Sequence, residues 1–108
     1  MDCIFCKIAK GELPSEIVYQ EKDFIAFKDI FPKAALHYLI IPKNHIESVA
    51  SDGSEEIIKD LIRIAKKIAI EQKIIGYKLL FNVGVEGGQI VPHLHLHLLA
   101  GSNSEIKI

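Results

Sequence analysis

The chain has 108 residues, of which 49% are hydrophobic and 25% are charged, which is enough for one core and too little for two independent domains. Lys and Arg number 13 against 14 Asp and Glu, so the formal charge of −1 gives no sign of a nucleic acid or an anionic membrane as partner, and a small ligand fits better. No apolar run reaches the roughly 18 residues of a spanning helix, and the start of the chain lacks the pattern of a signal peptide. We therefore expect a single soluble, cytoplasmic domain over residues 1–108.

Hydrophobic spacing predicts the elements of the N-terminal half. Apolar residues recur at helical spacing over residues 2–10, which indicates a short helix. Two β-rich runs follow at residues 17–19 and 24–27, split by a charged turn, and they predict a hairpin. An aliphatic run at residues 36–41 predicts a central strand.

A long helix dominates the C-terminal half. Residues 52–54 supply N-cap chemistry, and one apolar stripe continues until Gly76 can end the helix. The stripe consists of Ile57, Leu61, Ile64 or Ala65, and Ile68. Strands are expected at residues 78–83 and 91–100, joined by a loop with three glycines. This order of elements predicts an α+β fold: an antiparallel sheet of about five strands with one long helix and a short N-terminal helix.

Three of the five histidines stand at alternate positions, His93, His95 and His97, with leucines between them. In a strand all three project from one face, while the leucines project into the core from the other. A solvated strand face is the plain interpretation, but histidine is a rare choice for that purpose.

Two chemical interpretations of the histidine run remain. A metal ion shared by all three needs each nitrogen about 2.0–2.1 Å away, whereas Cα atoms at i and i+4 of a strand lie about 13 Å apart. Neighbours at i and i+2 lie only ~6.6 Å apart, close enough for two imidazoles to hold one anion. A largely neutral imidazole can also attack phosphorus, so the pattern favours catalysis on a phosphate.

A glycine-rich loop precedes the histidine run. Gly87, Gly88 and Gln89 place backbone N–H donors and a side-chain amide there, and Asn82 on the preceding strand could reach the same anion. A pair of glycines alone is more often just a turn. Beside three aligned histidines, the loop favours an anion site.

The run from His93 to Leu99 matches at every position the pattern His-φ-His-φ-His-φ-φ, with φ apolar, and so resembles the histidine-triad (HIT) superfamily. Further segments resemble its Hint branch, the histidine-triad nucleotide-binding proteins, in order and spacing. These segments are residues 3–8, 26–30, 37–45, 82 and 87–89.

The resemblance implies a homodimeric hydrolase of purine nucleotides that cleaves the bond between the phosphate of AMP or GMP and an amine or acyl group. His95 would form a nucleotidyl-histidine intermediate, His97 would contact the phosphate, and His37 would support the triad. We expect the other ring nitrogen of His95 to donate to a backbone carbonyl, which fixes its tautomer. Asp29 would hold the ribose hydroxyls. The purine pocket would be walled by Phe5, Ile8, Leu13, Phe27 and Ile30, and the phosphate would be met by Asn82, Gly88, Gln89 and the backbone of Ile90.

Each of these roles has a structural alternative. Asp29 suits a turn cap before Phe31 equally well, the apolar set is more often plain core, and His37 can be a satisfied buried histidine. Ile90 departs from the family pattern, because many Hint members carry a serine there whose hydroxyl can donate to the leaving group or the phosphate. The alternative function is a purine nucleotide-binding module with negligible turnover. A dinucleoside polyphosphate hydrolase, another branch of the superfamily, fits less well because those chains are usually longer.

The two cysteines, Cys3 and Cys6, form a half-site for tetrahedral zinc that needs two further ligands. Similarity to bacterial members of the superfamily that carry a Cys-Cys-His-His set implies His45 and His93 as these ligands. The alternative is a pair of small core cysteines, with His93 facing the phosphate. If zinc binds, we expect a structural role and no cofactor in catalysis.

A second apolar face of the long helix gives the implied homodimer a weak physical basis. Ile58, Ile62, Ala69 and Ile70 lie beside the core stripe, where a monomer has little to cover them. A helix of the partner subunit could cover them.

Overall fold

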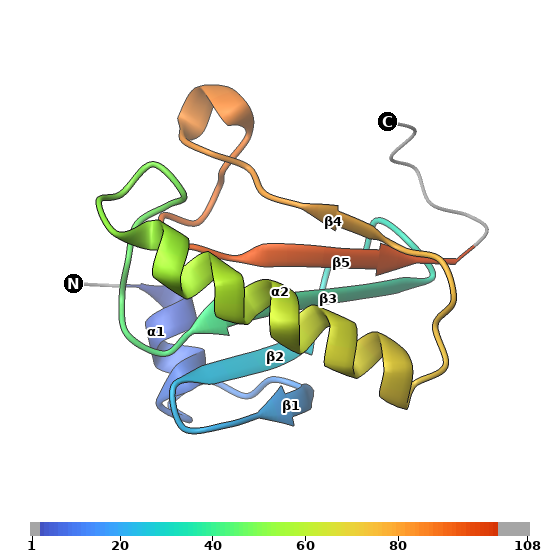
Figure 1. Ribbon diagram of the computed structural model, residues 1–108. Helices are drawn as coiled ribbons and strands as arrows, with labels where there is room; N and C mark the ends of the chain where they lie inside the picture. The colour runs from blue at the N-terminus through green and yellow to red at the C-terminus, as the bar shows by residue number, and fades with distance from the viewer. Residues whose placement is uncertain (1–2, 102–108) are drawn as a thin grey trace.

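The computed structural model describes residues 3–101, and within them five strands form one antiparallel sheet in the order β1-β2-β3-β5-β4 (Figure 1). The elements are α1 (Ile4–Ala9), β1 (Ile17–Gln20), β2 (Phe24–Lys28), β3 (Leu36–Pro42), α2 (Ser54–Glu71), β4 (Lys78–Leu80), the 3-10 helix η1 (Val85–Gly87) and β5 (Leu96–Ala100). The expected α+β fold, its hairpin β1-β2 and the central position of β3 are confirmed.

The two faces of the sheet are covered by different helices, because side chains alternate along each strand. On β3, Tyr38 and Ile40 belong to the core beneath α2, whereas Leu39 and Ile41 belong to a second core that includes Phe5 of α1. Figure 1 shows α2 lying across the sheet and α1 at the end of the sheet near the start of the chain. The face that carries α1 also receives the histidine side chains.

Helix α2 packs through the predicted stripe, since Leu61, Ile64, Ala65 and Ile68 are buried. The helix begins within the predicted residues 52–54, but no side chain caps it, and its other end differs from expectation. The N-cap is Gly53 in a left-handed conformation with no side-chain cap, and the Ser54 hydroxyl instead donates to the Val49 carbonyl at 2.5 Å. Among residues 3–101, no helix is long and apolar enough to cross a bilayer.

The helix also ends at Glu71, five residues before Gly76, where the sequence predicted the end. Lys73 takes a left-handed conformation with φ of 57°, and two backbone hydrogen bonds close the terminus. The Ile74 N–H donates to the Ala69 carbonyl at 2.8 Å, and the Lys73 N–H donates to the Ile70 carbonyl at 3.2 Å. This is a Schellman terminus with a lysine at the position that usually holds glycine.

The last two strands are shorter than the expected residues 78–83 and 91–100. Pro92 has no N–H for a ladder, and the Leu94 N–H donates to the carbonyl of Ile46, outside β3, at 2.7 Å. His93 and His95 therefore precede β5. The alternation survives nevertheless, because the intervening leucines lie in the core beneath α2.

Candidate active site

Three histidines, His37, His95 and His97, meet on the face of the sheet that carries α1. His37 on β3 and His97 on β5 belong to paired strands, with Leu39 opposite His97 and His37 opposite Leu99. The rings of His95 and His97 lie 4.9 Å apart, and those of His37 and His97 lie 5.1 Å apart, centroid to centroid. The structure thus brings together all three residues expected to be catalytic.

A backbone contact fixes the tautomer of His95. Its Nδ1 lies 2.7 Å from the carbonyl oxygen of His93. Because a carbonyl oxygen only accepts, Nδ1 must carry the proton, and Nε2 is left with a free lone pair. Burial lowers the pKa of His95 below its ordinary value, against the opposing effects of this hydrogen bond and of Asp29, so the ring is neutral at pH 7. The expected bond to a backbone carbonyl is confirmed.

His97 has the opposite tautomer, set by a chain of hydrogen bonds. The backbone N–H of Lys33 donates to Nδ1 of His37 at 3.0 Å, so Nε2 of His37 carries a proton. That Nε2 lies 2.9 Å from Nδ1 of His97 and donates to it. The proton of a neutral His97 is therefore on Nε2.

The Nε2 atom of His97 is buried and has no hydrogen-bond partner within residues 3–101. Burial, together with neighbouring His95 and His37, lowers the pKa of His97 to about 4. A neutral N–H donor without a partner is therefore held beside a neutral ring with a free lone pair. One ring can attack an electrophile while the other donates to it, as nucleophilic catalysis on a phosphate requires.

Asp29 follows β2 and acts as a turn cap. Its Oδ1 accepts from the backbone N–H of Phe31 at 2.9 Å, and its Oδ2 lies 3.5 Å from Nε2 of His37. The structural alternative raised by the sequence is therefore present. Asp29 also favours the charged form of His37, whose pKa burial lowers. Its expected role on ribose hydroxyls stays a prediction.

The glycine-rich loop uses most of its own donors, so the N–H groups of Gly88 and Gln89 that were expected to meet the phosphate are bonded within the protein. The Gly88 N–H donates to the Val85 carbonyl at 3.0 Å, and the Gln89 N–H donates to the Gly84 carbonyl at 3.0 Å. The buried Gln89 side chain donates both N–H bonds to backbone carbonyls, of Glu47 at 2.8 Å and of Val91 at 3.0 Å.

Two members of the expected phosphate set keep polar groups that the loop does not use. Asn82 donates one N–H bond of its amide to the Gly87 carbonyl at 2.9 Å and has a second to offer. Within residues 3–101, the backbone N–H of Ile90 has no hydrogen-bond partner, and its side chain is 91% exposed. These two groups remain the candidates for phosphate contact in this loop.

The five residues expected to wall a purine pocket divide into two groups. Phe5 and Phe27 are buried and stack edge to face at 5.4 Å, and Ile8 packs partly against their core. Leu13 and Ile30 are exposed, Ile30 by 77%. Phe5 and Phe27 are therefore core residues, and only Ile8, Leu13 and Ile30 have exposed surface that a purine base could contact.

A cavity of about 300 Å³ opens beside His45, away from these residues. It is lined by Asp23, Phe24, Pro42, Asn44, His45, Ile46, Ile57 and Asp60. None of the residues expected to bind the nucleotide lines it. The hydrogen-bond geometry of the histidines is therefore the better guide to the site of chemistry.

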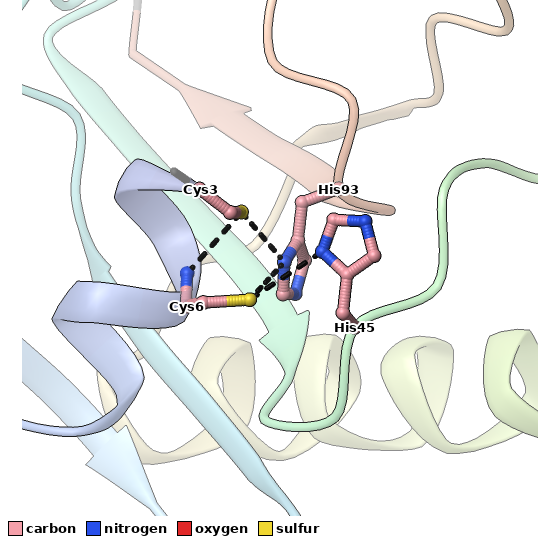
Figure 2. Close-up of side chains that lie close together, drawn as sticks. All are labelled: Cys3, Cys6, His45 and His93. Carbon is pink, nitrogen blue, oxygen red and sulfur yellow. Dashed lines mark hydrogen bonds between the residues drawn. The ribbon is translucent and has the colours of Figure 1, made fainter. Parts of the chain in front are cut away.

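The four residues Cys3, Cys6, His45 and His93, here called the Cys–His cluster, come together as expected (Figure 2). Nδ1 of His93 lies 3.2 Å from Sγ of Cys3 and 3.5 Å from Sγ of Cys6, while Nδ1 of His45 lies 3.4 Å from Sγ of Cys6. Figure 2 shows both sulfurs directed from α1 toward the two rings. The ring of His93 is therefore directed at the two cysteines, and Cys3 is also buried in the core that includes Phe5.

The donor set of the cluster fits a tetrahedral zinc ion. Zn–S bonds of about 2.3 Å and Zn–N bonds of about 2.0–2.1 Å place sulfur and nitrogen roughly 3.6 Å apart in a tetrahedron, close to the three distances found. Nε2 of His93 donates to the Pro42 carbonyl at 2.8 Å, which leaves Nδ1 unprotonated as a ligand must be. Burial and the hydrogen bond with Cys3 raise the pKa of Cys6, so a bound cation is what would hold thiolates here.

Sequence reasoning missed three functional contacts, all of them made by backbone atoms. The carbonyl of Pro42 orients His93, the N–H of Lys33 sets the tautomer of His37, and the carbonyl of Glu47 holds Gln89. Every residue carries such groups, so no residue type in the sequence could have signalled them.

Comparison with known proteins decides the family. A family model described as "Scavenger mRNA decapping enzyme C-term binding" matches residues 2–107. A purine nucleoside phosphoramidase from Escherichia coli (strain K12) is 44% identical over 104 residues, which cover 93% of this chain and 87% of that protein. The chain belongs to the histidine-triad family.

Solved histidine-triad structures match nearly the whole chain. A HIT family hydrolase from Clostridium thermocellum has a TM-score of 0.89 at 47% identity, and the match covers 99% of this chain and 96% of that one. A histidine triad protein from Clostridium difficile has a TM-score of 0.90 at 43% identity, covering 94% and 92%. The histidine-triad fold therefore accounts for the arrangement described above, including the meeting of His95 and His97.

Proposed function

We propose that this histidine-triad protein is a purine nucleoside phosphoramidase that releases AMP or GMP through a nucleotidyl-histidine intermediate. The observation that carries the proposal is the pair of opposite tautomers, with a lone pair on Nε2 of His95 and a proton on Nε2 of His97. The E. coli relative named purine nucleoside phosphoramidase and the HIT family hydrolases support the same class of reaction.

The reaction proceeds in two displacements at phosphorus. Nε2 of His95 attacks the phosphorus, the new N–P bond forms as the bond to the amine breaks, and the amine leaves with a proton taken from water. Nε2–H of His97 donates to a phosphate oxygen and stabilises the charge that develops there. Water then attacks the nucleotidyl-histidine, which releases the nucleoside monophosphate and restores His95. The Ile90 side chain has no hydroxyl to assist the leaving group, so we expect amines that leave readily to be the better substrates.

The direct test is release of AMP from a fluorogenic adenosine phosphoramidate. We expect turnover by the unmodified protein and a loss of several orders of magnitude in kcat for His95→Ala, with AMP still bound. Binding of AMP by the unmodified protein without turnover would instead identify a purine nucleotide-binding module. Gly76→Ala, at an exposed position with open space around it and no left-handed backbone, serves as a control for handling and purity.

We also propose that the Cys–His cluster holds one structural zinc ion that pins α1 to the loops around the sheet. All four positions would be filled by Cys3, Cys6, His45 and His93, so no open site for water is left and catalysis remains with His95 and His97. Elemental analysis of protein purified without a polyhistidine tag should find about one zinc per chain. Cys3→Ser should lose both metal and thermal stability, and metal-free protein with unchanged melting would overturn the proposal.

The homodimer and the cytoplasmic location complete the proposal. Support for the homodimer comes from apolar residues on α2 that the chain leaves exposed, Ile62 by 38% and Ile70 by 77%. Ala69, expected in this set, is instead buried within the chain, and Ile58 packs partly against the core. The cytoplasm suits the two free cysteines, since thiols stay reduced there.

A further inference from the structure

One residue, His93, belongs to both the Cys–His cluster and the catalytic site. Its ring contacts the two cysteines through Nδ1, while its backbone carbonyl accepts the proton of Nδ1 of His95 at 2.7 Å. The carbonyl that fixes the tautomer of the nucleophile is therefore part of a residue whose side chain the cluster holds.

The ring of His93 is held from both of its nitrogens. It is fully buried, its Nε2 donates to the Pro42 carbonyl at 2.8 Å, and its Nδ1 faces the sulfurs of Cys3 and Cys6 (Figure 2). Since His93 and His95 precede β5, no strand ladder holds this segment. The peptide that carries the His93 carbonyl is held instead by its other group, the Leu94 N–H, which donates at 2.7 Å to the carbonyl of Ile46, the residue after His45 of the cluster. The direction of the His93 carbonyl is thus restrained from two sides, by the ring of His93 and by this bond to the residue after His45, and both restraints involve residues in or next to the cluster.

A second contact links the cluster to the nucleophile through Phe5. This residue lies on α1 between Cys3 and Cys6, and its ring packs edge to face on His95 at 5.1 Å and on His93 at 5.9 Å. Any shift of α1 that frees the sulfurs also moves the ring that packs against His95. Both contacts lead from the cluster to the same imidazole.

We infer that His93 is a positioning residue for His95, and that the Cys–His cluster, by fixing the ring of His93, selects the tautomer of the nucleophile. The inference rests on the proposed function for its catalytic consequence, but its structural part stands without turnover. When the cluster is broken, the His93 carbonyl turns away and Nδ1 of His95 loses its acceptor. A neutral imidazole without a fixed partner populates both tautomers, and the form protonated on Nε2 has no lone pair there for attack.

The tautomer of His95 can be read directly by nitrogen NMR of the full-length, ¹⁵N-labelled protein. Zinc-loaded protein should show His95 as a single form protonated on Nδ1. Chelation of the unmodified protein, or the double variant Cys3→Ser/Cys6→Ser, should give a mixture of the two forms. Adding Zn²⁺ back should restore the single form in the unmodified protein and not in the double variant.

Kinetics give a second readout that loss of stability alone would not produce. With an adenosine phosphoramidate, the double variant should lose roughly tenfold to a hundredfold in kcat, the range typical of lost outer contacts, while its affinity for AMP changes less than twofold. Ile64→Val is the matched control, because it loosens the core beneath α2 on the other face of the sheet and touches neither site. It should lower the unfolding temperature while kcat and the His95 tautomer stay unchanged.

Two results would overturn the inference. One is a single Nδ1-protonated form of His95 that persists after chelation and in the double variant. The other is an equal change of tautomer in Ile64→Val, which would show a general response to instability. Failure of the proposed function is seen separately, as absence of AMP release from zinc-loaded protein whose His95 still shows the single form.

Discussion

Two adjacent histidines, His95 and His97, are chemically identical side chains with different hydrogen-bond partners. A carbonyl oxygen holds the proton of His95 on Nδ1, whereas the N–H of His37 holds the proton of His97 on Nε2. At pH 7 both rings are neutral, because burial lowers their pKa values. The assignment of nucleophile and donor therefore follows from atoms outside the two rings.

Substitution of His37 tests whether it orients His97. His37→Leu removes the donor to Nδ1 of His97 and leaves that buried atom without a partner. We expect kcat to fall about a hundredfold, the size of effect found when one oriented donor to a developing charge is lost. His37→Gln keeps an N–H and should retain more activity. Equal activity of the two variants, measured on the same phosphoramidate, would show that orientation of His97 is unimportant.

The low pKa of His97 predicts a loss of stability in acid. Its pKa drops from 6.5 to about 4 on folding. Between these values the unfolded chain binds a proton at His97 that the folded chain does not. The free energy of unfolding is therefore highest above pH 6.5 and decreases as the pH falls toward 4. In this pH range the free energy of unfolding should decrease by about 1.4 kcal/mol for each pH unit.

The contribution of His97 is isolated by urea unfolding of the unmodified protein and of His97→Gln at pH 7 and pH 5. Subtracting the variant removes the effect of metal loss, which both proteins share. The advantage of the unmodified protein should shrink at pH 5. A difference that is the same at both pH values would contradict the lowered pKa.

At the scale of the elements, the end of α2 carries a correctable strain. Lys73 has a φ of 57°, which costs a residue with a Cβ about 1–2 kcal/mol. Lys73→Gly removes that cost, and after the larger backbone entropy of glycine is subtracted the protein should gain about 0.5–1 kcal/mol. Thermal unfolding measures the change. Lys73→Ala, which removes the same charge and keeps the Cβ, should not be stabilising, and equal behaviour of the two variants would rule out relief of strain.

Residue patterns predicted the presence and order of the elements better than their ends. The stripe on α2 and the alternation of leucines and histidines before Ala100 follow from burial, which periodicity reports directly. The end of α2 at Glu71 and the late start of β5 depend on backbone hydrogen bonds with the Ala69, Ile70 and Ile46 carbonyls. The pattern of side chains in the sequence does not show which backbone carbonyls will accept these hydrogen bonds.

The candidate site was predictable to the same degree. The type and spacing of the histidines and cysteines indicate what they can bind or catalyse. The sequence therefore predicted both the three histidines His37, His95 and His97 and the Cys–His cluster. Gln89 and Gly88 were predicted to contact the phosphate, because an amide and a flexible backbone can bind an anion. In the structure their N–H groups instead donate to backbone carbonyls in and around the loop. Donors that look available in a sequence are often satisfied within the fold.

At the scale of the whole molecule, the exposed apolar face of α2 predicts assembly. Ile70 on α2 is 77% exposed and Ile75, four residues after the helix ends, is 99% exposed. Burying such side chains gains about 1.5–3 kcal/mol each, which favours a second copy over solvent. Light scattering at micromolar concentration should give the mass of a dimer, and Ile70→Lys should shift the mass toward the monomer. A monomer mass for the unmodified protein would refute the dimer.

The central claim is that Nε2 of His95 attacks phosphorus, and mass spectrometry of an alkali-quenched or rapidly frozen reaction, kept out of acid because it hydrolyses the N–P bond, tests it most directly. After incubation with an adenosine phosphoramidate, the chain should gain the mass of one adenylyl group, and fragmentation should place it on His95. His95→Ala should show no such gain, whereas His97→Gln should still accept the group at a lower rate. An adduct on any other residue, or near-normal turnover by His95→Ala, would contradict the account.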